Sequence, residues 1–165
     1  MVPPDDDSDG NSFSAKSIII PDSATNIDEG WFAGCKGLTN IKVDQNNAAF
    51  CDIDGVLFSK DKTKLVYYPN GRNNASYTIP KGTTDIADMA FIICESLTDI
   101  IIPDSVCYIG TSAFYGCCSM KRITIPNSVN YIGQLAIMDK TIECHRGSVA
   151  EEYSKKYNNL CKIID

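Results

Sequence analysis

The sequence predicts a β-rich solenoid in which short repeats stack on one another, and three observations lead to this fold class. The first is a recurring Ile-Pro pair, found 23 residues apart at Ile79-Pro80, Ile102-Pro103 and Ile125-Pro126. The second is a constant register of apolar residues after each proline. The third is the short unit, which has room for a strand and a tight turn but not for two helices. Because such a unit cannot bury its apolar side alone, neighbouring units must share one core.

The register repeats at fixed distances from each proline. A fourth pair, Ile20-Pro21, precedes Pro80 by one such period plus an insertion that is longer than a repeat. Six positions after the prolines stand Ile27, Ile86, Ile109 and Ile132. Eleven positions after them stand Phe32, Phe91, Phe114 and Ile137. Fourteen positions after them stand Cys35, Cys94, Cys117 and Lys140. The register therefore predicts about four 23-residue units in a right-handed stack over residues 17–144.

Each unit is expected to contain one short strand. The Leu-x-x-Ile-x-Ile stretch is typical of a strand, as in Leu97–Ile102, and the proline that follows ends the strand because it has no amide hydrogen to donate. The recurring cysteines Cys35, Cys94 and Cys117 stand within the apolar register. A free cysteine in that setting behaves as a small buried apolar residue, so we expect buried thiols.

This unit resembles the BspA-type leucine-rich repeat, also called the Treponema pallidum type. The runs that carry the resemblance are IPDSVCYIGTSAFYGCCSMKRI at Ile102–Ile123 and IPKGTTDIADMAFIICESLTDI at Ile79–Ile100. The resemblance covers Ile18 to about Cys144, with departures at Trp31 and at Ile137–Lys140. It implies a leucine-rich repeat solenoid in a cell-surface or secreted protein of bacteria or protist parasites, used in adhesion and protein binding.

The insertion and the C-terminus have patterns of their own. Within residues 44–76, the runs Val56–Phe58 and Leu65–Tyr68 flank a polar stretch, which predicts a β-hairpin that projects from the solenoid or pads one side. Residues 145–165 are expected to form a helical cap. Ser148 followed by Glu151 is a capping-box pattern, apolar residues recur at helical spacing after it, and a last strand is expected after the helix.

Charge and composition exclude several classes of protein. The net charge of −6, with no visible basic patch, argues against nucleic-acid binding, which needs clustered Lys and Arg. No apolar run is long enough to span a membrane, so we expect no membrane insertion within this segment. Residues 1–16 are acidic and lack the features of a signal peptide, so a flexible leader is expected there.

Four local motifs suggest other chemistry, and for each we favour a simpler interpretation. Asp52 and Asp54 lie in a D-x-D-G-x-L run like the nucleophile motif of haloacid dehalogenase phosphatases, but repeats flank it, so a hairpin is expected. His145 is the single histidine; zinc binding with Cys161 is the alternative to a surface residue. Asn74-Ala75-Ser76 is a glycosylation sequon that matters only in a eukaryotic secretory route. The half EF-hand loop has no bidentate Glu and is expected to be disordered; its residues are Asp5, Asp7, Asp9 and Gly10.

The candidate site is the outward face of the stacked strands. Residues that alternate with core positions point away from the interior, and Tyr67 and Tyr68 on the hairpin offer further contact area. The candidate partner-binding residues are therefore Ile19, Asn40, Lys42, Thr78, Asp99, Ile101, Arg122, Thr124, Glu143, Tyr67 and Tyr68. We expect a protein or host extracellular ligand, no enzyme activity and no cofactor. The alternative is a structural spacer in a larger surface protein, with no ligand of its own.

Overall fold

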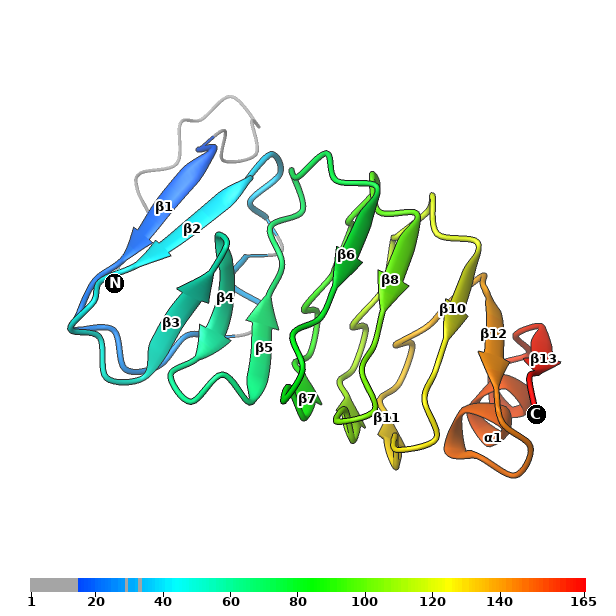
Figure 1. Ribbon diagram of the computed structural model, residues 1–165. Helices are drawn as coiled ribbons and strands as arrows, with labels where there is room; N and C mark the ends of the chain where they lie inside the picture. Colours follow the sequence, from blue (N-terminus) through cyan, green and yellow to red (C-terminus); the bar gives the residue numbers. More distant parts are fainter. Residues whose placement is uncertain (1–14, 29, 33) are drawn as a thin grey trace.

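The computed structural model describes residues 15–165 except residues 29 and 33. The chain winds into a solenoid of about six turns, one after another along a single axis (Figure 1). One short strand of each turn lies along the same side of the solenoid. These strands are β1 (Ser17–Ile20), β2 (Asn40–Val43), β6 (Ser76–Thr78), β8 (Asp99–Ile101), β10 (Arg122–Thr124) and β12 (Thr141–Cys144). The hydrogen-bonded pairs β1–β2, β6–β8 and β10–β12 are parallel, as expected of consecutive repeats.

A second, six-stranded sheet contains the other strands of the turns and the insertion. Its order is β11-β9-β7-β5-β4-β3. The strands are β3 (Phe50–Ile53), β4 (Val56–Ser59), β5 (Lys64–Tyr67), β7 (Asp85–Ile86), β9 (Tyr108–Ile109) and β11 (Tyr131–Ile132). The β5–β7, β7–β9 and β9–β11 pairs are parallel, and they align Leu65, Ile86, Ile109 and Ile132.

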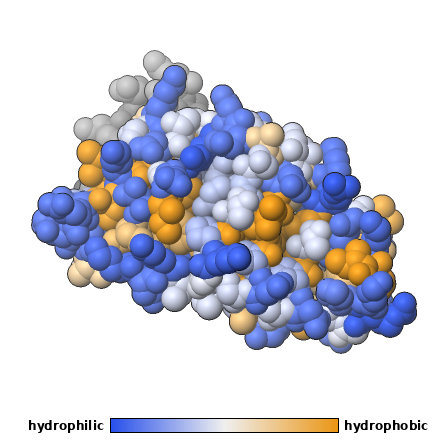
Figure 2. Space-filling model, viewed as in Figure 1, coloured by the Kyte–Doolittle hydropathy of each residue, from blue (hydrophilic) through white to orange (hydrophobic). Residues whose placement is uncertain are grey.

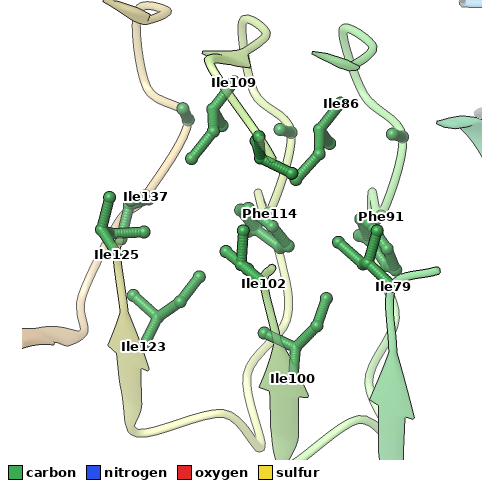
Figure 3. Packing of buried hydrophobic residues seen from close by; sticks show 14 of the residues in the cluster. Ile79, Ile86, Phe91, Ile100, Ile102, Ile109, Phe114, Ile123, Ile125 and Ile137 are labelled. Carbon is green, nitrogen blue, oxygen red and sulfur yellow. The ribbon is translucent and has the colours of Figure 1, made fainter. Parts of the chain in front are cut away.

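Equivalent side chains of successive turns lie next to one another in the core. The rings of Phe91 and Phe114 stack with centroids 5.1 Å apart, and both side chains are fully buried. The isoleucines before the prolines, Ile79, Ile102 and Ile125, form a second row beside them (Figure 3). Hydrogen bonds between turns recur as well: the Thr39 hydroxyl donates to the Lys16 carbonyl and the Thr98 hydroxyl to the Ala75 carbonyl, in each case 23 residues earlier. The predicted stacking is confirmed.

The inserted residues form most of another turn of the solenoid as well as a hairpin. The predicted strands pair as β4 and β5, and β3 adds a third antiparallel strand at the edge of the sheet. After β5 the chain rejoins the repeat geometry: the Tyr68 amide donates to the Ala90 carbonyl, as the Phe91 amide does to Ala113 in the next turn. The insertion therefore extends the stack, and four recognisable units become about six turns.

A left-handed residue recurs in the turn after β7, β9 and β11. Met89, Ser112 and Leu135 stand at equivalent places in successive repeats and have φ angles of 55°, 54° and 54°. This conformation is unfavourable for residues with a side chain. The neighbouring turn compensates, because the Met89 amide donates to the Thr111 carbonyl and the Ser112 amide to the Gln134 carbonyl.

The C-terminal cap has the predicted helix and strand. Helix α1 (Val149–Lys156) begins after Ser148, whose hydroxyl accepts the Glu151 amide hydrogen at 3.3 Å. β13 (Cys161–Ile163) then pairs in parallel with β12. Buried Tyr153 on the helix donates from its hydroxyl to the Ile137 carbonyl, which fastens the helix over the last repeat.

Among the described residues, no helix is long and apolar enough to cross a membrane.

Candidate protein-binding face

The outward positions of β1, β2, β6, β8, β10 and β12 make one surface, which we call the strand face. Alternation along each strand produces it: in β8, Ile100 is buried whereas Asp99 and Ile101 are exposed, and β10 repeats the pattern around Ile123. Nine of the eleven predicted residues lie on this face. Seven of them are exposed, and Asn40 and Glu143 are half-buried. The nine are Ile19, Asn40, Lys42, Thr78, Asp99, Ile101, Arg122, Thr124 and Glu143.

The strand register brings these side chains together in pairs. Ile19 lies beside Lys42 in the β1–β2 pair, and Thr78 lies beside Ile101 in the β6–β8 pair. Ile19 is 69% exposed and Ile101 56%, although both are large apolar residues. Figure 2 shows hydrophobic patches among the hydrophilic surface on this side of the molecule. Exposed apolar patches rimmed by polar groups are typical of interaction sites.

At the end of the strand face near the cap, Glu143 makes hydrogen bonds with neighbouring strands. Glu143 accepts from the Thr124 hydroxyl at 3.1 Å and from the Lys162 ammonium at 2.8 Å. These hydrogen bonds, that from Lys162 foremost, lower the pKa of Glu143 below its ordinary value. Glu143 is therefore ionised at neutral pH, and its charge is already paired within the chain.

The expectation that Tyr67 and Tyr68 offer contact surface is wrong. Each side chain is only 1% exposed. Tyr67 stacks on Phe32 with ring centroids 4.6 Å apart, and Tyr68 stacks on Phe91 at 5.2 Å. The reason is that β5 and the residue after it belong to a turn of the solenoid, so both rings pack in the core, Tyr67 in the cluster around Phe32 and Tyr68 in the cluster around Phe91.

Sequence reasoning missed two exposed tyrosines outside the strand face. Tyr131 is 46% exposed on β11, and its ring is nearly parallel to that of Tyr108 on β9, with centroids 4.8 Å apart. Tyr115 is 48% exposed in the turn after β9. The outward direction of Tyr108 and Tyr131 could have been predicted from the repeat, because each of them precedes an inward isoleucine and therefore points outward.

A hollow lies at the N-terminal end of the described solenoid. It has a volume of about 440 Å³ and is lined by Ile20, Pro21, Ser23, Ala24, Thr25, Asn26, Ile27, Asp28, Trp31 and Phe32. These residues belong to the first described turn, where no described turn covers the core from the preceding side. Cys35 of the same turn is half-buried for this reason, in contrast to the expectation, whereas Cys94 and Cys117 are buried as expected.

The D-x-D-G run forms a turn. Asp54 and Gly55 have φ angles of 50° and 78° between the paired residues Ile53 and Val56, which is the geometry of a tight hairpin connection. Asp52 accepts a hydrogen bond from the Val43 amide at 2.8 Å and so fastens β3 to the strand-face side. The half EF-hand loop at residues 5–10 lies outside the described residues.

The thiols and the single histidine do not gather into a metal site within the described part of the chain. No group of three or more His, Cys, Asp or Glu side chains there is placed to hold an ion. His145 instead lies 3.2 Å from an Asp165 carboxylate oxygen. Cys161 lies near Cys144, with the two sulfur atoms 3.5 Å apart.

Comparison with known proteins identifies the fold family. The family model described as the BspA type leucine rich repeat region matches residues 10–74 and 66–145 in six copies. The chain therefore belongs to the BspA-type leucine-rich repeat family. A comparison with curated protein sequences found no match.

Solved bacterial structures share the fold. A leucine-rich repeat protein from Eubacterium ventriosum is 32% identical with a TM-score of 0.74, over 81% of this chain and 37% of that one. A leucine rich cell surface protein from Faecalibacterium prausnitzii is 21% identical with a TM-score of 0.62, over 94% of this chain and 50% of that one. The pneumococcal vaccine antigen PcpA is 21% identical with a TM-score of 0.55, over 91% of this chain and 56% of that one. The chain thus spans between about a third and somewhat more than half of these relatives.

Proposed function

We propose that this chain is a non-catalytic binding segment of a bacterial cell-surface or secreted protein, and that its strand face holds a protein partner. The observation that carries the proposal is the exposure of Ile19 and Ile101 at outward positions of β1 and β8, whose other exposed residues, Ser17 and Asp99, are polar. Complete burial of a fully exposed isoleucine side chain is worth about 1.5–3 kcal/mol. A partner that covers these partly exposed side chains gains a share of that free energy.

The charges on the strand face favour a partner of mixed character. Lys42 lies beside Ile19, and Asp99 and Arg122 lie on the neighbouring strands β8 and β10. A surface with apolar centres and both signs of charge suits a protein, whereas a nucleic acid requires a basic patch. The family and the relative described as a cell surface protein support an exported location.

Surface plasmon resonance against a panel of host extracellular matrix and plasma proteins tests this function. The chain is immobilised as wild type, as Ile101→Asp and as Lys42→Glu. Tyr131→Ser is the matched control, because it changes an exposed side chain on the six-stranded sheet. We expect at least one panel protein to bind wild type and control equally and to lose tenfold or more in affinity for the strand-face variants.

The second candidate is a spacer that carries other domains and binds nothing itself. The relatives extend well beyond the matched region, as a spacer within a longer surface protein requires. Panel binding that is absent, or that the strand-face variants leave unchanged, would favour this spacer over the binding function.

A further inference from the structure

We propose that Cys144 and Cys161 form a reversible disulfide that fastens the C-terminal strand β13 to the last repeat. Their sulfur atoms lie 3.5 Å apart, on the adjacent parallel strands β12 and β13. The register pairs Ile142 with Cys161 and Cys144 with Ile163, so the two cysteines are diagonal neighbours. To close the bond the sulfur atoms must approach from 3.5 Å to about 2 Å, which calls for rotation of the exposed Cys161 side chain and a small shift of the short strand β13 toward β12.

The two thiols differ in a way that assigns their roles. Cys161 is exposed at the end of the solenoid, whereas Cys144 is fully buried. Burial, reinforced by the neighbouring Cys161, raises the pKa of the Cys144 thiol to about 11. The Cys161 thiolate is therefore the group that meets an external reagent, and Cys144 is the resolving cysteine.

A disulfide compound in the surroundings, either a small molecule or a protein, is the oxidant. The Cys161 thiolate attacks one sulfur of that disulfide, which forms a mixed disulfide and releases the first thiolate. Cys144 then loses its proton to water and attacks the Cys161 sulfur, which expels the second thiolate. The external disulfide gains two electrons and becomes two thiols, and the two cysteines lose the same two electrons.

The bond would close a covalent loop of the chain that contains the whole cap helix. The two cysteines are 17 residues apart, and α1 lies between them. Without the bond, β13 is held by its pairing with β12 and by contacts such as that of the Ile164 amide with the Cys144 carbonyl and that of Lys162 with Glu143. β13 pairs with β12 alone, and an edge strand of this kind is where fraying begins. The disulfide would thus protect the C-terminal end of the solenoid under oxidising conditions.

Oxidation of the purified chain with oxidised glutathione tests the proposal. The samples are wild type, Cys161→Ser and Cys118→Ser, the last a control because Cys118 is also exposed. We expect wild type and Cys118→Ser each to yield a peptide that links Cys144 to Cys161. Their melting temperature should rise by roughly 5–10 °C and return on reduction. Cys161→Ser should show no such link and no such rise.

Three results would overturn it: no intramolecular link in the wild type, a link from Cys161 to a different cysteine, or the same rise in melting temperature in Cys161→Ser. A Cys161→Ala variant repeats the comparison without a hydroxyl, so that a new hydrogen bond from serine cannot mimic the effect.

Discussion

The ring of Phe114 lies nearly parallel to that of Phe91, its equivalent in the preceding repeat, with centroids 5.1 Å apart. Tyr68 continues the column at 5.2 Å from Phe91. Each ring thus packs against the same position of the next turn, and the solenoid is held together by contacts between neighbours. The energetic consequence of losing one ring is correspondingly large.

Replacing Phe114 with Ala should destabilise the fold strongly. The side chain is fully buried, so the change leaves a cavity between two turns and should lower the free energy of unfolding by about 3–5 kcal/mol. Urea denaturation followed by circular dichroism measures it. The neighbouring Tyr115→Ala is the control, because its side chain is half in water and its loss should matter far less. Equal effects of the two changes would contradict the column.

Gly110 should not tolerate a side chain. A Cβ atom there would lie 2.6 Å from the Ala87 carbonyl carbon of the preceding turn. Gly110→Ala should therefore push two turns apart and cost about 1–3 kcal/mol in the same denaturation experiment. Gly34→Ala is the matched control, since no atom beyond the adjacent residues of the chain lies within 4 Å of its added Cβ. A Gly110→Ala protein as stable as wild type would contradict this close contact between the two turns.

Glu151 should stabilise the cap in a pH-dependent way. The Lys155 ammonium and the Gly147 amide donate to its carboxylate and lower its pKa below the ordinary value of 4.5. A carboxylate whose pKa is lowered in the folded state stabilises that state above the unfolded pKa, and the contribution is lost as the pH falls through the folded pKa. Glu151→Gln should therefore melt below wild type at pH 7, and the difference should vanish in acid.

The control for this pH series is Glu152→Gln, which removes the same charge from the same helical turn but from an exposed position. A difference between Glu151→Gln and wild type that is constant from pH 7 to pH 3 would show that the Glu151 charge does not stabilise the cap.

Lys140 should carry a burial penalty. It occupies the position of Cys94 and Cys117 in the last repeat, is only 6% exposed, and donates to the Met138 carbonyl at 3.0 Å. Burial lowers its pKa below 10.5. The cost of burying the charged Lys140 is fully present below the pKa that Lys140 has in the folded chain. It shrinks as the pH rises from that pKa toward 10.5, the pKa in the unfolded chain, where the unfolded chain also loses the proton.

Lys140→Met should therefore melt above wild type at pH 7, and the gain should diminish toward pH 10.5. Thermal melts at several pH values measure it, with Lys121→Met as the exposed control. A Lys140→Met chain that is less stable at pH 7 would show that the Lys140 hydrogen bond outweighs the cost of burying the charge.

Much of the architecture was predictable because the repeat obeys a simple rule. A short unit with isoleucine, phenylalanine and cysteine at fixed places can bury those residues only by stacking, so Phe91 and Phe114 had to meet. The alternation along each strand likewise placed Ile101 and Arg122 outside. The helix at residues 149–156 followed from Ser148 and Glu151, since capping depends on residues close in sequence.

The insertion was predicted less well. Tyr67 ends β5 and Tyr68 follows it, and no repeat register surrounds them, so their place in the core could not be predicted from the sequence. Their burial depends on the pairing of β5 with β7, a strand that the chain reaches only after passing through β6. A contact of that kind is decided by how the whole turn closes.

The amino-acid sequence by itself determined the family, the period and the inward or outward direction of each strand residue, because these depend on a pattern that every turn repeats. The tertiary structure alone decided that residues 44–76 extend the stack, that two tyrosines are core residues and that Cys144 meets Cys161. Those outcomes depend on which distant segments lie side by side, and segments outside the repeat register carry no local signal for their neighbours.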